Sequence, residues 1–229
     1  MALEPDSGFA ILPGVFSAAE LAPGADAGSS ALLRRSRAGA RNALSHPAFA
    51  ALACDARLLQ IASRVLEGEA FPFRATLFDK SKRSNWLAVW HQDTALPLRA
   101  RRDVPGWGPW STKAGVLYAH APGEALSRIV ALRVHLDDST AENGPLRVLG
   151  GTHLQGILTD AEIQEKVRAI APIECVVSRG GVVVMRPLLV HSSSKALGPL
   201  PRRVLHIEYA TSRVLGDCLE LDVVDPTVA

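Results

Sequence analysis

The stretch from Trp86 to Thr94, WLAVWHQDT, is an apolar run that ends in a histidine and an aspartate. Imidazole and carboxylate groups bind metals, and side chains two residues apart in a β-strand project to the same face, roughly 7 Å apart at the backbone. We therefore expect His91 and Asp93 to converge on one ion. Two ligands rarely hold a metal, and the best candidate for a third is His191, which follows the second long apolar run, from Gly181 to Val190.

Two histidines and one carboxylate on one side of a metal leave neighbouring coordination positions open, as in non-haem Fe(II) oxygenases. The HxD pair alone is a weak signal. Arg202 adds to it, because it lies at the opening of the next predicted strand, where its guanidinium can bind the far carboxylate of a dicarboxylic cosubstrate. Ser193 shares the face of His191 if the segment is extended. The alternative is that Arg202 and Arg203 form a surface pair on an edge strand.

Length and composition predict one folded globular domain over residues 1–229. A hydrophobic content of 48% with 21% charged residues excludes a disordered chain, and the formal charge of +2 is too small to favour a nucleic-acid partner. No apolar run is long enough for a membrane-spanning helix, and the first residues show no secretory pattern. Cys54, Cys175 and Cys218 have no paired spacing, which is typical of a reducing compartment. We expect a cytoplasmic protein with a small-molecule substrate and no membrane partner, whose oligomeric state stays open.

The N-terminal part, up to about residue 70, is expected to be mainly helical. A short strand is predicted from Gly8 to Gly14, and Ser17 with an acidic residue three positions later has the spacing of a capping box. The small, polar segment from Gly24 to Ser30 predicts a loop. Leucines that recur every seven residues predict one amphipathic helix from Pro47 to Glu69.

From about residue 71 to 212 the chain consists of short apolar runs separated by turn residues, which is typical of an α+β protein with a jelly-roll core. One short helix is predicted within this part, at residues 160–170. The predicted strands are 71–79, 85–93, 128–136, 145–149, 173–178, 181–190 and 202–210.

The segment from Thr94 to Ser127 is rich in proline, glycine and tryptophan and shows neither helical nor strand periodicity. A loop of that length in a compact domain is typical of an active-site loop or lid. Trp107 and Trp110 either cover the pocket as a lid or form a small satellite core that holds the loop in place.

With these motifs in this order, the chain resembles the phytanoyl-CoA dioxygenase family of Fe(II)/2-oxoglutarate oxygenases. FDKSKRSNWLAVWHQD is similar to the metal-strand segment of the family, and RVHLDDSTAENGPLRVLGGTH to its strand, acidic turn and hairpin. MRPLLVHSSSK followed by RRVLHIEYA is similar to the distal histidine and cosubstrate arginine. The resemblance runs from about Gly8 to Ala210. Gly150 and Thr152 depart from the proline and serine that the family has in its hairpin.

The resemblance implies a double-stranded β-helix, the jelly-roll core already expected from the strands, with flanking helices that are mostly N-terminal. It implies iron ligands at His91, Asp93 and His191 and cosubstrate contacts at Arg202, Ser193 and Gln92, the middle residue of His-Gln-Asp. Arg203 is the alternative to Arg202, because a register error of one residue would exchange them.

For other polar residues, the position in the sequence alone indicates a role. Asn85 is a further cosubstrate candidate, because a regular strand places it on the face of His91, six residues later. Lys80 and Lys82 precede the same strand, and one of these three residues is expected to contact the cosubstrate or an acidic group of the substrate. An exposed turn is favoured for Lys82. His153 is expected to form a hydrogen bond that stabilises the fold. His135 and His206 lie in the middle of strands, where a structural position is favoured and lining of the barrel is the alternative.

The implied activity is hydroxylation of an unactivated C–H bond of a small molecule, with Fe(II), 2-oxoglutarate and O2 as cofactor and cosubstrates and with release of succinate and CO2. One alternative is a zinc-dependent hydrolase, in which the same ligands activate water. Another is a non-catalytic, cupin-like module that binds a metal or small molecule. The arginine and serines after His191 favour the oxygenase, because a hydrolase needs no anchor for a dicarboxylate.

Overall fold

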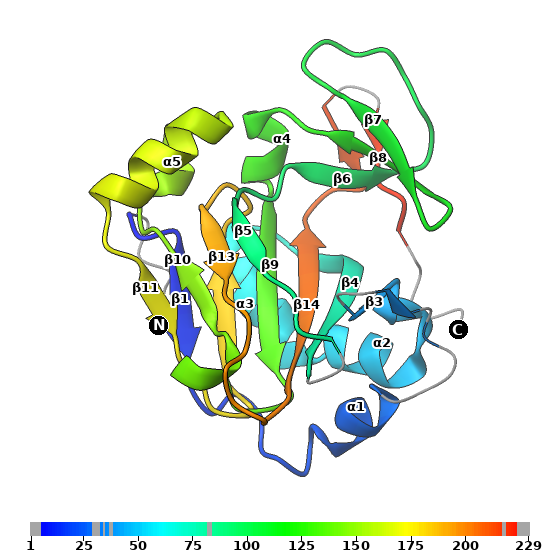
Figure 1. Cartoon of the computed structure of the whole chain (residues 1–229). Helices are drawn as coiled ribbons and strands as arrows, with labels where there is room; N and C mark the ends of the chain where they lie inside the picture. Colours follow the sequence, from blue (N-terminus) through cyan, green and yellow to red (C-terminus); the bar gives the residue numbers. More distant parts are fainter. Residues whose placement is uncertain are drawn as a thin grey trace.

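Two antiparallel sheets that face each other form the centre of the molecule (Figure 1). The computed structural model describes residues 6–28, 33, 35, 36, 39–81, 84–216 and 219–223. Within these ranges the larger sheet has seven strands in the order β1-β12-β9-β14-β4-β3-β2, and the smaller has four in the order β11-β10-β13-β5. The expected α+β jelly-roll core is confirmed.

The strands of the two sheets come from distant parts of the chain. The larger sheet contains β1 (Phe9–Leu12), β2 (Arg35–Ser36), β3 (Gly39–Arg41), β4 (Phe71–Lys80), β9 (Ile129–His135), β12 (Val182–Met185) and β14 (Arg202–Ala210). The smaller sheet contains β5 (Ala88–His91), β10 (Leu146–Val148), β11 (Ile173–Cys175) and β13 (His191–Ser193).

Helices and short hairpins surround the sheets. The helices are α1 (Ala22–Ala27), α2 (Pro47–Ala53), α3 (Ala56–Leu66), α4 (Gly123–Ser127) and α5 (Asp160–Ala169), and the 3-10 turns are η1 (Ala43–Ser45), η2 (Ala141–Asn143) and η3 (Thr152–Gln155). The remaining strands are β6 (Ala95–Leu98), β7 (Trp110–Lys113), β8 (Val116–His120), β15 (Val214–Leu215) and β16 (Leu219–Glu220). None of the helices in the described ranges is long and apolar enough to cross a membrane.

The outer face of the larger sheet packs on the N-terminal helices and forms the main hydrophobic core. Leu205, Ile207 and Tyr209 of β14 point into this core, and the Tyr209 hydroxyl donates a 2.8 Å hydrogen bond to the Ala53 carbonyl at the end of α2. Because side chains alternate along a strand, the even-numbered residues of β14 face the smaller sheet. The outer face of the larger sheet therefore carries apolar side chains that stabilise the fold, and the inner face carries polar side chains.

The predicted helix from Pro47 to Glu69 is two helices, because the chain breaks at Cys54 and Asp55. The Asp55 carboxylate accepts a 2.9 Å hydrogen bond from the Arg57 N–H and so caps the N-terminus of α3. The capping-box contacts at Ser17 do form, but the residues that follow make a turn, and α1 begins only at Ala22. The predicted loop from Gly24 to Ser30 is correspondingly wrong at its start, and its last two residues lie outside the described ranges.

The segment from Thr94 to Ser127 is also more regular than predicted. It forms the sheet β6-β8-β7 and the helix α4, which lie together at the top right of Figure 1. These strands are only four or five residues long, and Pro97 and the glycines near Trp107 interrupt the pattern, so no period is visible in the sequence. Trp107 and Trp110 pack against a second hydrophobic cluster, which favours the satellite-core interpretation over a lid.

The cap at α3 gives a direct test of this local structure. Asp55→Ala removes the acceptor of the Arg57 N–H, so we expect the free energy of unfolding to fall by about 1 kcal/mol. Urea unfolding followed by circular dichroism measures this change. Asp103→Ala, in a loop with a side chain that is 91% exposed, is the control and should change the stability little. Equal stabilities of the two variants would contradict the assignment of Asp55 as the cap.

Candidate active site

Three metal-ligating side chains meet between the smaller sheet and the turn that follows β5. In His91, Asp93 and His191, one ligand atom each lies within 4.8 Å of the others. Asp93 Oδ1 is 3.8 Å from Nε2 of His91, and Asp93 Oδ2 is 3.6 Å from Nε2 of His191. Two imidazole nitrogens and one carboxylate at this spacing fit a single divalent ion with open coordination positions.

Backbone pairing of β5 with β13 brings the two histidines together. His91 ends β5, His191 begins β13, and the two residues are direct partners across the strands, with ring centroids 4.2 Å apart. Nδ1 of His91 is 2.7 Å from the Val89 carbonyl, and Nδ1 of His191 is 2.9 Å from the Leu189 carbonyl. A carbonyl only accepts, so each Nδ1 carries the proton, and each Nε2 is left as the metal ligand.

Asp93 lies beyond the strand that was predicted to carry it. β5 ends at His91, and the Asp93 N–H donates a 2.9 Å hydrogen bond to the Pro187 carbonyl in the turn before β13. The same-face expectation for two residues of one strand is therefore wrong in its geometry, although the two side chains do converge. The Asp93 side chain is 31% exposed and that of His91 41%, so the cluster is open to solvent on their side.

Gln92 is used to hold this turn. Its amide nitrogen donates hydrogen bonds to the carbonyls of Gly156 (2.9 Å) and Leu188 (2.7 Å), and its oxygen accepts one from the Leu158 N–H (2.8 Å). Both N–H donors of the amide are thus directed at backbone. In place of the expected cosubstrate contact, the structure gives Gln92 the role of positioning its neighbours, His91 and Asp93.

Asn85 has a similar structural role. Its amide makes reciprocal hydrogen bonds with the backbone of Ala196, donating to the carbonyl at 2.9 Å and accepting from the N–H at 2.7 Å. This pair ties the approach to β5 to the loop after β13 and directs the amide away from the role of cosubstrate contact. Lys82, for which an exposed turn was favoured, lies outside the described residues.

The charge states of the ligands suit metal binding near neutral pH. Burial lowers the pKa of His191 to about 4, against an opposing effect of the Asp93 charge, so the imidazole is neutral and can donate its lone pair. Burial alone would raise the pKa of Asp93. The combined opposing effect of the neighbouring basic groups is larger and holds the pKa well below its ordinary value; these groups are His191, His206, His91 and Arg74. The carboxylate is therefore ionised.

Two buried cationic side chains contact the Ser193 hydroxyl next to the metal ligands and form a candidate anion site. Arg202 is 2% exposed and donates from Nη2 to Ser193 Oγ at 3.2 Å. Lys80 is 1% exposed and donates from Nζ to the same oxygen at 2.7 Å. Ser193 lies on the face of His191, two residues along β13, so the backbones of these two residues are roughly 7 Å apart.

Arg203 faces the other side of the sheet and already has a partner. Its Nε and Nη2 bind the two oxygens of Asp137, each at 2.8 Å, and Nη1 donates to the Ala25 carbonyl at 2.7 Å. Arg202 forms no ion pair with a carboxylate of the described residues. The geometry therefore favours Arg202 over Arg203 as the residue that binds an external anion.

Gly144 packs closely against the residues of this anion site. Its φ is +68°, and a Cβ there would clash with the Ser194 carbonyl and come within 3.0 Å of Lys80 Nζ. The Gly144 carbonyl also accepts the Ser193 hydroxyl proton at 2.9 Å. The Asn-Gly-Pro motif, which the sequence presents as a turn signal, thus fixes the position of the anion-binding side chains.

Two further buried side chains, Arg133 and His206, lie on the inner sheet face; the sequence analysis provided an expectation for His206 but none for Arg133. Arg133 of β9, which is 6% exposed, donates from Nη1 to Nδ1 of His206 of β14 at 3.1 Å, and His206 is 4% exposed. An arginine only donates, so His206 is neutral with its proton on Nε2; burial and Arg133 keep its pKa well below the ordinary value. The signal in the sequence was charged residues at alternate positions of two apolar strands.

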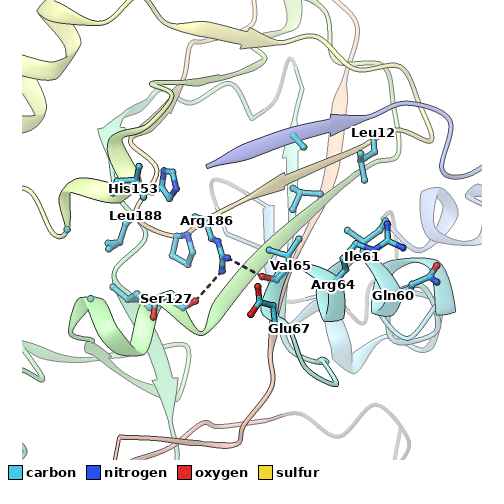
Figure 2. A pocket seen from close by; sticks show the side chains of 17 residues that line it. Leu12, Gln60, Ile61, Arg64, Val65, Glu67, Ser127, His153, Arg186 and Leu188 are labelled. Carbon is cyan, nitrogen blue, oxygen red and sulfur yellow. Dashed lines mark hydrogen bonds between the residues drawn. The ribbon is translucent and has the colours of Figure 1, made fainter. Parts of the chain in front are cut away.

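A cavity of about 720 Å3 lies on the outer side of the sheet, and none of these groups lines it. Figure 2 shows its wall, where Arg186 donates to the carbonyls of Ser127 and Val65 at 3.1 Å each. The cavity borders the turn at Pro187 and Leu188, whose carbonyls accept hydrogen bonds from Asp93 and Gln92. The chemistry of the side chains, and not cavity size, identifies the active site.

Comparison with known proteins gives one family and several similar structures. The profile of the phytanoyl-CoA dioxygenase (PhyH) family matches residues 6–204. L-Proline trans-4-hydroxylase of Streptomyces griseoviridis is 25% identical over 178 residues, which are 66% of this chain and 59% of that protein. The chain therefore spans less than two thirds of the length of this relative.

Among solved structures, EctD from S. alaskensis with 2-oxoglutarate and 5-hydroxyectoine has a TM-score of 0.69 and 20% identity, over 90% of this chain and 73% of that one. AviO1 from Streptomyces viridochromogenes Tue57 has a TM-score of 0.65 and 23% identity, over 92% of both chains. The epimerase SnoN from nogalamycin biosynthesis, in complex with Fe3+, alpha ketoglutarate and nogalamycin RO, has a TM-score of 0.66 and 19% identity, over 91% and 80%. At these identities the three structures show a common fold.

The buried histidines predict how stability depends on pH. Burial, with the charges of Arg133 and Arg202, lowers the pKa of His135 to about 3, whereas an unfolded chain has about 6.5. Between these values the unfolded state binds more protons, so the stabilisation is complete above pH 6.5 and is lost as the pH falls towards 3. In His135→Gln, the loss of stability between pH 7 and pH 5 should be smaller by about 2 kcal/mol than in the unaltered protein.

Urea unfolding of metal-free protein at the two pH values measures this difference. His120→Gln changes an exposed histidine and should keep the full pH dependence. The account of His135 is wrong if its variant has the same pH dependence as the unaltered protein.

Proposed function

Because the chain belongs to the phytanoyl-CoA dioxygenase family, we propose that it is an Fe(II)/2-oxoglutarate-dependent oxygenase that hydroxylates an unactivated C–H bond of a small molecule. The overall reaction takes the substrate, O2 and 2-oxoglutarate to the hydroxylated product, succinate and CO2. One oxygen atom enters the product and the other enters succinate, so atoms and electrons balance. The similarity to a proline hydroxylase supports hydroxylation as the outcome.

The observation that carries this proposal is that one short strand carries a metal-ligating site and, beside it, a site formed by buried cationic side chains. β13 begins with His191, which faces the carboxylate and imidazole of Asp93 and His91, and ends with Ser193, which contacts two buried cations. A ligand that bridges the two sites must bind a metal at one end and be anionic at the other. A short dicarboxylate with an oxo group, such as 2-oxoglutarate, has this chemistry.

Ferrous iron, held by His91, Asp93 and His191, would supply the coupling of O2 reduction to oxidative decarboxylation of the cosubstrate. The two imidazoles and the single carboxylate leave neighbouring coordination positions free for cosubstrate and O2. The backbone hydrogen bonds to each Nδ1 keep both rings oriented in the absence of ligands, which lowers the entropic cost of binding. The exposed edges of His91 and Asp93 leave the cluster accessible from solvent.

We assign the distal carboxylate of 2-oxoglutarate to Arg202, with Ser193 and Lys80 as additional donors. The guanidinium and hydroxyl are buried and already oriented toward each other, so their geometry needs little change on binding. Burial lowers the pKa of Arg202 to about 9, which leaves it charged at neutral pH. An ionised, desolvated donor makes a strong hydrogen bond with a carboxylate.

The two alternative functions leave part of the site without a use. A zinc hydrolase needs the three ligands and a water molecule but no buried pair of cations beside them. A non-catalytic cupin-like module has no reason to keep neighbouring coordination positions open to solvent. The relatives also limit the claim of hydroxylation, because SnoN is an epimerase and SnoK a carbocyclase on the same fold.

The ligand assignment predicts a spectroscopic result. Anaerobic addition of Fe(II) and 2-oxoglutarate should give a weak visible charge-transfer band, which His91→Ala and Asp93→Ala should lose together with succinate formation. His120→Ala, at the exposed last residue of β8, is the matched control and should retain both. Undiminished succinate formation in His91→Ala would refute the assignment, and zinc-only metal content with no band would favour the hydrolase.

The cosubstrate assignment predicts a difference between neighbouring arginines. Arg202→Gln should raise the 2-oxoglutarate concentration at half-saturation at least about tenfold, because a charged hydrogen bond to the distal carboxylate is lost. Arg203→Gln breaks the pair with Asp137 on the other sheet face and should leave this concentration within about twofold. Titration of the charge-transfer band with 2-oxoglutarate measures both values. The reverse order would move the anchor to Arg203.

A further inference from the structure

Arg133 is a buried cation on the inner face of the larger sheet that the proposed reaction does not yet use. It lies in the middle of β9, where its direct neighbours across the sheet are His206 of β14 and Val183 of β12. Its side chain is only 6% exposed. The Asp93 carboxylate is near enough to raise the pKa of Arg133 against the larger lowering by burial. Because it lies opposite His206, Arg133 shares with Arg202 the inner face of the larger sheet, which faces the smaller sheet and its metal ligands.

The guanidinium of Arg133 is incompletely satisfied. Nη1 donates to His206, and the group lies 5.2 Å from the ring centroid of Phe78. Nε is buried and has no hydrogen-bond partner among the described residues. A neutral imidazole and an aromatic face do not neutralise a buried charge, and an uncompensated buried charge is costly to the fold. An unsatisfied buried donor of this kind is a candidate hydrogen-bond contact for a ligand.

The charges around the site do not balance after the proposed cofactors are added. Lys80, Arg133 and Arg202 are all buried, and none of them forms an ion pair with a carboxylate in the described ranges. The other inward carboxylate, Glu208, is paired with Arg74. Three cations and a divalent metal, set against Asp93 and the two carboxylates of 2-oxoglutarate, leave two positive charges.

The net charge of the site stays positive even when Lys80 is counted as neutral. Burial, with the charges of Arg202 and Arg133, lowers the pKa of Lys80 to about 7, so this lysine is partly neutral at physiological pH. If Lys80 is counted as neutral, one positive charge remains, and Arg133 is the cation that no proposed ligand contacts. The missing negative charge must come from the substrate.

We propose that the substrate carries an oxyanion, a carboxylate or a phosphate group, which binds Arg133 through the guanidinium edge that includes Nε. This inference rests on the proposed function and specifies the class of its substrate. A planar fork of N–H donors binds either group through two parallel hydrogen bonds. With its charged end fixed at Arg133, the remainder of the substrate is directed toward the open positions beside His91 and Asp93.

Anion binding to protein loaded anaerobically with Fe(II) and 2-oxoglutarate tests this inference. Inorganic phosphate and acetate are titrated separately by isothermal calorimetry, which distinguishes a phosphate from a carboxylate preference. We expect at least one of them to bind, with an affinity about tenfold lower in Arg133→Gln and intermediate in Arg133→Lys, which keeps the charge without the fork. Arg168→Gln removes the same charge at an exposed arginine of α5 and should match the unaltered protein.

The charge-transfer band, read in the same samples, separates the two levels of the proposal. In Arg133→Gln the affinity for 2-oxoglutarate should stay within about threefold. A tenfold loss would place Arg133 in the cosubstrate site and overturn the inference, as would equal anion binding by Arg133→Gln and the unaltered protein, or no anion binding by either. If the unaltered protein shows no band, the oxygenase assignment fails, while calorimetry still reports on the anion site.

Discussion

The active site depends on the backbone pairing of β5 with β13, because this pairing alone sets His191 directly opposite His91. The two strands are short, and each imidazole is fixed by a hydrogen bond to a carbonyl two residues earlier. Ser193 follows on the same face, so one short strand carries both a metal ligand and the hydroxyl that Arg202 contacts in the anion site. A shift of one residue in this register would turn the metal ligand and the serine away from the site together.

The larger sheet allows this polar interior by burying its apolar side chains on the opposite face. Along β14, residues 205, 207 and 209 pack against the N-terminal helices, whereas residues 202, 206 and 208 face the smaller sheet. The hydrophobic contacts of the outer face stabilise the sheet, so the inner face can hold buried cations that are unfavourable without ligands. The same face thus selects for bound anions, since each one removes an uncompensated charge.

The sequence was most informative where chemistry and local pattern coincide. The metal ligands lie at the ends of apolar runs, and the order of motifs was enough to predict the jelly-roll core and the position of Arg202. It was least informative where the outcome depends on a distant partner. Arg203 is paired with Asp137, which favours Arg202 as the anchor, and Gln92 and Asn85 hydrogen-bond to backbone groups far along the chain. Such contacts between distant segments are visible only after folding.

The most direct test of the central claim is a crystal structure of the protein prepared without oxygen and soaked with Mn(II) and 2-oxoglutarate. We predict one anomalous peak bonded to Nε2 of His91, Nε2 of His191 and the Asp93 carboxylate, with the distal carboxylate of 2-oxoglutarate on Arg202 and Ser193. A metal bound elsewhere, or a distal carboxylate that lies away from Arg202, would contradict the account.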